Sequence, residues 1–302
     1  MDEPVSSVVF MSAMEEKQPN VTPASAAKDY VESVVRRSGT SFFWAMRRLP
    51  EVKRQGMYAV YAYCREVDDI ADDEGEQAGK TARLGQWRGE IEHLYGGGEP
   101  EFLVAQALVN PIVRFGLQKK DFLALIDGME TDAADRLRIA AMDGLFLYCD
   151  QVACAVGRLS NRIFGVDEER GDRVAHALGL ALQLTNILSD LREDAGRNRL
   201  YLPADLLTAH GINEDNPEAV LAHPAIAGVC AELAEIATNR FAEAESALAL
   251  CDRRQMRPAI MMMQVYRRIL EKLKKRGWER ISGPVRLPRL QKLWIAFRYG
   301  IF

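Results

Sequence analysis

The sequence predicts an all-α fold, and three observations lead to that class. Apolar residues recur at spacings of three and four along stretches such as "RVAHALGLALQLTNILSDLRED", which is the period of a helix with one buried face. Runs that alternate apolar and polar residues, as strands do, do not occur in the sequence. Proline is absent between Pro111 and Pro203, so long helices meet no strong breaker in the middle of the chain.

The same spacing predicts where each helix lies. The expected segments, with bounds defined to within a few residues, are 26–37, 51–73, 80–95, 100–117, 119–130, 138–164, 167–195, 203–209, 218–250 and 254–277. The stretches "GGGEPE" and "DNPEAVLAHP" indicate loops because of their glycine and proline content. Neither loop separates two regions of different composition, so residues 26–280 are expected to form a single helical domain.

The two ends of the chain differ from this domain. Residues 1–25 have acidic residues before a very short apolar stretch, unlike a signal peptide, and we expect a disordered leader. Residues 281–302 mix Arg and Lys with Leu, Trp, Ile and Phe, which fits either peripheral contact with a membrane or an ordinary packing tail. No segment approaches the ~20 consecutive apolar residues of a membrane-spanning helix.

Composition narrows the function classes. The chain has 302 residues, 48% of them hydrophobic, which is enough for one large domain with a substantial core. The net charge is -4 and the basic residues are spread along the chain, so nucleic acid is not expected as a partner. The five cysteines are odd in number and form no C-x-x-C pair, which predicts reduced thiols and a cytoplasmic location.

A dense acidic segment, "REVDDIADDEGE", directly follows an uncharged run, "MYAVYAYC". On a helix, Asp68 and Asp72 are four residues apart and share a face, about one turn (~5.4 Å) from each other. The uncharged run before them is typical of a helix enclosed by other helices. The carboxylates after Asp72 fit a solvated loop, whereas the inner pair needs a partner charge or a metal ion if it is buried.

A second polar stripe supplies that partner. Gln183, Asn186, Asp190 and Asp194 are spaced three, four and four residues apart on an otherwise apolar helix. Two oxygen-rich stripes on separate buried helices favour a hard divalent cation such as Mg²⁺, which usually shares its coordination shell with substrate phosphates. Arg65 and Arg199 lie next to the two stripes and are suited to bind diphosphate oxygens.

A segment between the stripes, "LYCDQVACAVGRL", carries small residues at Ala153, Ala155 and Gly157. They permit either close helix packing or space for a long apolar ligand. Together with Tyr148, Val152 and the aromatic segment "SFFWAM", they are candidates to line a deep apolar channel beside the polar stripes.

Four segments in this order, "SFFWAMRRLP", "YAVYAYCREVDDIAD", "YCDQVACAVG" and "LQLTNILSDLREDAGRNRLYLP", resemble the squalene and phytoene synthase family. The resemblance extends over about residues 28–280, and within the family it is strongest to bacterial members that form presqualene diphosphate for hopanoid and squalene biosynthesis. It implies a single helical bundle of the isoprenoid-synthase type around a central cavity, in which the two aspartate stripes hold Mg²⁺.

Carried over position by position, the resemblance implies three sets of site residues. The implied ligands of Mg²⁺ are Asp68, Asp72, Asn186, Asp190 and Asp194. The candidate catalytic residues are Tyr61, Arg65, Tyr148, Arg199 and Tyr201, and the candidate substrate-binding residues are Ser41, Phe42, Val152, Gly157, Gln183 and Tyr266. The chain departs from the family at Ser189, where many members have an arginine, and Arg192 or Arg197 is a candidate replacement.

The activity implied by the resemblance is a Mg²⁺-dependent, head-to-head condensation of two molecules of farnesyl diphosphate to presqualene diphosphate. NADPH is not expected as a cofactor, and downstream squalene-forming enzymes are candidate partners. The alternatives within the family are a phytoene synthase, which joins two geranylgeranyl diphosphates, and a complete squalene synthase. Outside this chemistry the alternatives are a non-catalytic helical assembly factor and a chain-elongating prenyltransferase or terpene cyclase.

Overall fold

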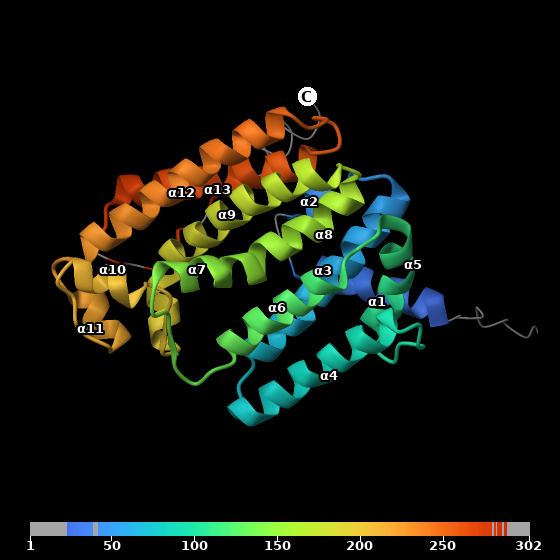
Figure 1. The fold of residues 1–302 in the computed structure, drawn as a ribbon, viewed down its shortest axis with the longest axis horizontal. Helices are drawn as coiled ribbons and strands as arrows, with labels where there is room; N and C mark the ends of the chain where they lie inside the picture. Colours follow the sequence, from blue (N-terminus) through green and yellow to red (C-terminus); the bar gives the residue numbers. More distant parts are fainter. Residues whose placement is uncertain (1–22, 39–41, 280, 282, 286, 289–302) are drawn as a thin grey trace, which may run out of the picture.

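Most of the helices in the computed structural model run side by side in one general direction (Figure 1). The structure describes residues 23–38, 42–279, 281, 283–285 and 287–288. Most of the expected leader and C-terminal tail therefore lies outside the described residues. Within them, the predicted all-α class is confirmed, and none of the described helices is long and apolar enough to cross a membrane.

The elements are α1 (Pro23–Arg37), α2 (Phe42–Arg47), α3 (Glu51–Asp72), α4 (Gln77–Tyr95), α5 (Leu103–Phe115), α6 (Lys119–Asp132), β1 (Leu137–Arg138), α7 (Met142–Cys149), the π-helix η1 (Asp150–Cys154), α8 (Ala155–Phe164), α9 (Glu168–Gly196), β2 (Arg199–Leu200), α10 (Ala204–Ala209), α11 (Pro217–Ala222), α12 (Ile226–Ala249) and α13 (Arg257–Arg276).

The predicted helices differ from these elements at three places. The short helix α2 was not expected, and the segment predicted as one helix over 138–164 contains β1, α7, η1 and α8. The segment predicted over 218–250 is two helices, α11 and α12. The second break has a local cause, because Pro224 has no backbone N–H to continue α11.

Helix α9 is the centre of the packing. It contacts α8, η1, α12 and α13 along its length, while α3 contacts α1, α5, α6 and α8. Helix α8 therefore lies between α3 and α9, the two helices that carry the acidic stripes. One continuous hydrophobic core extends over all of these helices.

Two glycines admit the π-helix η1 between its neighbours. A Cβ atom on Gly179 of α9 would lie 2.8 Å from the Cα and backbone N of Cys154, and one on Gly128 of α6 would lie 2.4 Å from Cγ1 of Val152. Such contacts are too close for any side chain. The backbone of η1 thus approaches α9 closely at Gly179, and the Val152 side chain of η1 packs against α6 at Gly128.

The two short strands fix the chain that follows α9. They pair in parallel, with Leu137 opposite Arg199 and Arg138 opposite Leu200. Asn198 directly precedes β2, and its backbone is in the left-handed region with φ of 57°. Its side-chain oxygen accepts a hydrogen bond from Arg138 at 2.8 Å. This pairing directs Arg199 toward the end of α6.

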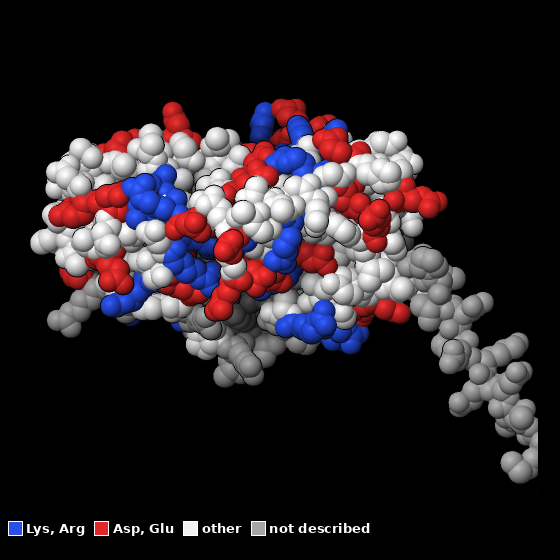
Figure 2. All heavy atoms as spheres, turned by 90° about the horizontal axis from the view of Figure 1, so that it is seen from below, with Lys and Arg blue, Asp and Glu red and all other residues white. Residues whose placement is uncertain are grey.

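Charges are mixed on the face of the molecule seen in Figure 2. Lys and Arg side chains alternate with Asp and Glu side chains over this face, without a large region of one sign. Ion pairs among the described residues include Arg136 with Asp215 and Arg138 with Asp215.

Candidate active site

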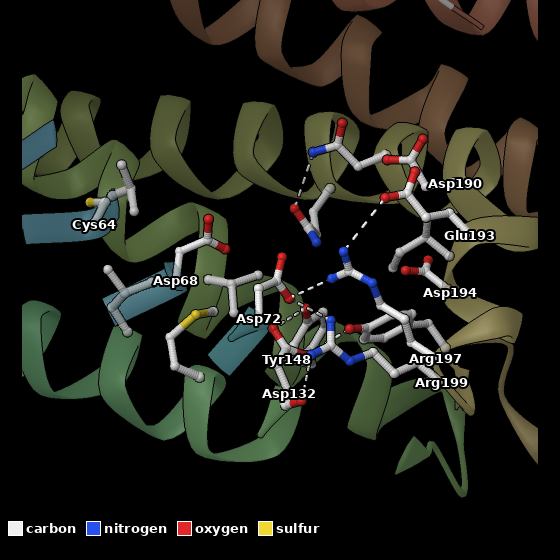
Figure 3. A pocket seen from close by; sticks show the side chains of 18 of the residues that line it. Cys64, Asp68, Asp72, Asp132, Tyr148, Asp190, Glu193, Asp194, Arg197 and Arg199 are labelled. Atoms are coloured by element: carbon white, nitrogen blue, oxygen red, sulfur yellow. Dashed lines mark hydrogen bonds and ion pairs between the residues drawn. The ribbon is translucent and has the colours of Figure 1, made fainter. Parts of the chain in front are cut away.

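A polar cavity of about 550 Å³ opens between α3, α6, η1, α9, β2 and α13, and Figure 3 gives a close view of it. Most of the residues predicted from the sequence line it: Tyr61, Arg65, Asp68, Asp72, Tyr148, Val152, Gln183, Asn186, Asp190, Asp194, Arg199, Tyr201 and Tyr266. Gly157 lies in an adjoining apolar pocket. Ser41 is outside the described residues, and Phe42 begins α2 without a described side chain.

The two acidic stripes lie on opposite sides of this cavity. Asp68 and Asp72 come from the last turns of α3, and Asp190 and Asp194 come from the last turns of α9 (Figure 3). Burial and the neighbouring Asp72 raise the pKa of Asp68 to about 6. Burial and the neighbouring Asp190 raise the pKa of Asp194 to about 7. Burial and the neighbouring carboxylates therefore both disfavour the ionised forms of Asp68 and Asp194.

Two arginines reach across the cavity to α3, Arg197 from the α9–β2 connection and Arg199 from β2. Arg199 is only 8% exposed, and its Nη1 donates to Oδ1 of Asp72 at 2.8 Å. Arg197 Nη1 lies 2.8 Å from the same oxygen. Burial opposes the ionisation of Asp72, but the hydrogen bonds from Arg199 and Arg197 hold its pKa below the ordinary value. One oxygen of Asp72 is thus occupied by guanidinium groups.

Arg65 is held on the opposite side by its own helix. Its Nη1 donates to Oδ2 of Asp68 at 2.9 Å, and its Nη2 lies 2.6 Å from Oδ1 of Asp69. About half of the Arg65 side chain is exposed, so the guanidinium group remains accessible from solvent.

Asp132 is a buried member of the site that the sequence reasoning missed. This residue, at the end of α6, is 7% exposed and accepts hydrogen bonds from Tyr201 Oη at 2.7 Å and Tyr148 Oη at 3.0 Å. Its backbone oxygen accepts from Arg199 Nη2 at 2.8 Å. Burial raises the pKa of Asp132 to about 6, although the hydrogen bond from Tyr201 and the charge of Arg199 oppose that rise.

The network around Asp132 fixes two aromatic rings. The rings of Tyr148 and Tyr201 have centroids 5.0 Å apart and are tilted by 31°. Burial and the charge of Asp132 raise the pKa of the Tyr148 phenol well above its ordinary value. Both phenols therefore stay protonated at neutral pH and act as hydrogen-bond donors.

Ser189 points away from the cavity. It is 9% exposed, and its Oγ accepts a hydrogen bond from the backbone N–H of Val285 at 3.3 Å. Of the two arginines considered as replacements for the missing family arginine, Arg197 lines the cavity. Arg192 instead donates to the backbone oxygen of Ile281 at 3.2 Å. Glu193, which the sequence reasoning also missed, lines the cavity beside Arg197.

An apolar pocket of about 430 Å³ adjoins the polar cavity. The two spaces share the lining residues Tyr61, Cys64, Asp68, Val152, Val156 and Asn186. Burial and the neighbouring Asp68 raise the pKa of the Cys64 thiol to about 12, so this cysteine is not a nucleophile at neutral pH. The arrangement is that of an ionic mouth above a pocket for an apolar chain.

Comparison with known proteins agrees with this arrangement. The family model of squalene/phytoene synthase matches residues 35–291. The chain is 44% identical to the presqualene diphosphate synthase of Sinorhizobium fredii over 263 residues, which cover 87% of this chain and 94% of that protein. It is 39% identical to the presqualene diphosphate synthase of Zymomonas mobilis, with 96% of this chain and 99% of that protein covered.

A solved structure has the same architecture. The crystal structure of a dehydrosqualene synthase in complex with a ligand superposes with a TM-score of 0.80 at 26% identity, covering 92% of this chain and 98% of that one. The extent of the family match and the identity to full-length relatives lead to one conclusion: the chain belongs to the squalene/phytoene synthase family, a family of prenyltransferases.

Proposed function

We propose that the protein condenses two molecules of farnesyl diphosphate head to head, with Mg²⁺, into presqualene diphosphate and free diphosphate. The observation that carries the proposal is the ionic mouth, two facing aspartate stripes with an arginine pair between them, directly above an apolar pocket. The relatives named presqualene diphosphate synthase support this choice of product within the family.

The donor set at the mouth fits Mg²⁺. All of the candidate ligands offer oxygen, from the carboxylates of Asp68, Asp72, Asp190 and Asp194 and the amide of Asn186, and no soft donor is among them. Burial first, and the neighbouring carboxylates second, raise the pKa values of Asp68 and Asp194, and a bound cation would stabilise their ionised forms. When bound, Mg²⁺ supplies Lewis-acid stabilisation of the diphosphate leaving group.

The arginines would exchange partners when substrate binds. Arg197 and Arg199 now donate to Asp72, and Arg65 donates to Asp68. Diphosphate oxygens compete for the same guanidinium groups with more charge and better bidentate geometry. The released carboxylate oxygens are then available to the metal ion, so metal and diphosphate binding are expected to support each other.

The apolar pocket protects the cationic stage of the reaction. As the C1–O bond of one farnesyl diphosphate breaks, both electrons leave with the diphosphate and an allylic cation remains. The 2,3 double bond of the second farnesyl diphosphate attacks this cation, and loss of one proton closes the cyclopropane ring. Side chains such as Val152, Val156 and Leu182 keep water away from the cation, which would otherwise form an alcohol.

The candidate proton acceptors are the departing diphosphate and two tyrosines of the cavity, Tyr61 and Tyr148. The Tyr148 phenol has a strongly raised pKa, and its O–H donates a hydrogen bond to Asp132. Because this phenol stays protonated it cannot accept a proton in the ground state, so we propose the departing diphosphate as the acceptor, with Tyr61 as the alternative. Tyr148 and Tyr201 then act as fixed donors at the edge of the cavity.

Product analysis tests the proposal. The purified protein is incubated with farnesyl or geranylgeranyl diphosphate, with and without Mg²⁺ and NADPH, and the products are identified by mass spectrometry. We expect presqualene diphosphate from farnesyl diphosphate with Mg²⁺, and no squalene when NADPH is added. Phytoene from the longer substrate, or squalene with NADPH, would replace the proposed product by that of another family member. Failure to condense either substrate would favour a non-catalytic assembly factor.

A further inference from the structure

The helices that line the apolar pocket are α3, η1, α8, α9 and α13, and their lining residues lead away from the ionic mouth. On α3 the lining residues recede from Asp68 to Met57, and on α9 they recede from Asn186 to Val174. On η1 and α8 they recede from Val152 to Phe164. On α13 Tyr266 lines the mouth, whereas Met262 and Ala259 line the apolar pocket. The lining residues of all these helices therefore identify the same end of the pocket as the end far from the mouth.

The depth of the pocket follows from these positions. Along α3 and α9 the distance from the mouth residues to the far residues is roughly 16–18 Å at a rise of 1.5 Å per residue. An extended chain spans about 1.2 Å per bond, so a farnesyl chain reaches roughly 13 Å and a geranylgeranyl chain roughly 18 Å. The shorter chain ends before the far residues, whereas the longer one reaches them.

Phe164 is the bulkiest residue at the far end. It is 2% exposed and is the last residue of α8, where its backbone oxygen accepts a hydrogen bond from Lys53 Nζ at 2.7 Å. Gly165 follows in the left-handed region with φ of 82° and turns the chain toward α9. The hydrogen bond from Lys53 and the turn at Gly165 thus fix the backbone of Phe164. Its neighbours at this end, Met57 and Val174, are each 1% exposed.

We propose that Phe164 limits the length of the prenyl chain that the pocket accepts, so that it admits a farnesyl chain and excludes a geranylgeranyl chain. This inference rests on the proposed function, because it assigns the apolar pocket to the tail of a prenyl diphosphate. The difference between the two chains is about one isoprene unit, roughly 5 Å, which is comparable to the length of a phenylalanine side chain. Removing the ring is expected to make room for that unit.

The variant Phe164→Ala tests this role. We expect the ratio of kcat/KM for geranylgeranyl diphosphate to kcat/KM for farnesyl diphosphate to rise by about tenfold or more, the scale at which pockets discriminate by chain size. The matched control is Leu159→Ala, because Leu159 is 0% exposed, lies on the same helix and does not line the pocket. The control should lose stability without changing the ratio. An unchanged ratio in folded Phe164→Ala protein would overturn the proposal.

A binding measurement separates this inference from the proposed function. Unreactive thiodiphosphate analogues of the geranyl, farnesyl and geranylgeranyl chains are titrated calorimetrically into wild-type protein and the variants in the presence of Mg²⁺. Preferential gain of affinity for the geranylgeranyl analogue in Phe164→Ala supports the inference even if no condensation occurs. Presqualene diphosphate formation with unchanged chain preference leaves the proposed function intact and refutes the inference. If Phe164→Ala does not fold, Phe164→Leu is expected to give a smaller shift in the same direction, and no shift refutes the inference.

Discussion

A single buried carboxylate organises one wall of the candidate site. Asp132 accepts hydrogen bonds from two tyrosines, and its backbone oxygen accepts one from Arg199, so residues from α6, α7 and β2 are held in one network. Buried polar groups of this kind are tolerated only when they are satisfied. The network therefore couples the orientation of Tyr148, Tyr201 and Arg199 at the cavity.

Asp132→Asn is expected to lower turnover of farnesyl diphosphate by roughly 10²-fold, the cost of a small misplacement of groups in a site. An asparagine offers one acceptor oxygen and one donor group, so one of the two tyrosines loses its partner. Steady-state kinetics and a thermal melt by circular dichroism measure the effect. Asp127→Asn, on the same helix but paired with Arg88 at the surface, is the control. Equal turnover in both variants would refute the positioning role.

Asp194 gives a prediction about pH. Its pKa is raised by burial and by Asp190 to about 7, against 3.8 as the ordinary value. Between these pH values the folded protein binds more protons than the unfolded chain. The contribution of protonated Asp194 to the free energy of unfolding is therefore fully present below about pH 4 and is lost as the pH rises through 7.

Without divalent cations, Asp194→Asn should remove this loss of stability. We expect the free energy of unfolding at pH 8 to rise by ~1–2 kcal/mol, and to change little near pH 4. Urea unfolding in EDTA at several pH values measures it. Glu193→Gln, a neighbouring exposed carboxylate, should change stability by no more than ~0.5 kcal/mol at either pH. A destabilised Asp194→Asn protein at pH 8 would contradict the expected cost of holding an ionised Asp194 carboxylate buried beside Asp190.

The aspartate pairs could be predicted from the sequence, whereas Asp132 could not. Asp68 with Asp72, and Asp190 with Asp194, are four residues apart, so helix geometry alone puts each pair on one face. Asp132 stands in "METDAADR" without any such spacing, and its partners are far away in the sequence. Only the tertiary fold brings them together.

The π-helix is the element that the sequence pattern hides. The segment "DQVAC" keeps the apolar content of the helices on either side, so periodicity predicts an uninterrupted helix through it. The packing partners of η1, Gly128 on α6 and Gly179 on α9, lie on helices far from it in the sequence. The sequence pattern around η1 therefore does not reveal its π-helical winding. Because Val152 of η1 lines both the polar cavity and the apolar pocket, this local winding shapes the junction between them.

Gly179→Ala tests how tightly η1 is packed. Its Cβ would lie 2.8 Å from backbone atoms of Cys154, which cannot move aside as a flexible side chain would. We expect a loss of ~1–3 kcal/mol in the free energy of unfolding, as for other overpacked sites. Gly89→Ala on α4 is the matched control, because no atom lies within 4 Å of its added Cβ. The free energy of unfolding of Gly89→Ala should rise by ~0.5–1 kcal/mol because alanine has the higher helix propensity. A similar rise in Gly179→Ala would show that η1 moves aside at little cost.

At the scale of the whole molecule, the sequence predicts the helical class, the single domain and the pairing of two acidic helices with an apolar pocket. The class is confirmed, and the family match agrees with it. The breaks within the helical segments and the shape of the pocket depend on contacts between distant elements, so they could not be predicted from periodicity. The acidic stripes on α3 and α9 face each other with α8 packed against both helices.

That arrangement predicts that metal and diphosphate together stabilise the fold much more than either does alone. A Mg²⁺–diphosphate unit that contacts Asp68 on α3 and Asp190 on α9 would join two helices that both pack against α8. Ligand at 100 times its dissociation constant raises the free energy of unfolding by ~2.7 kcal/mol. Thermal melts should therefore shift upward strongly with Mg²⁺ and inorganic diphosphate together, and only weakly with either alone.

Asp190→Asn distinguishes this bridge from general ion binding. The variant should keep its helical content but lose most of the upward shift, because one side of the bridge loses a charged ligand. Glu169→Gln, an exposed carboxylate at the other end of α9, should keep the full shift. If Asp190→Asn retains the combined shift, or if diphosphate alone produces it, the two acidic stripes do not act as one metal site. The same melt with Asp68→Asn then tells whether α3 alone binds the ligand.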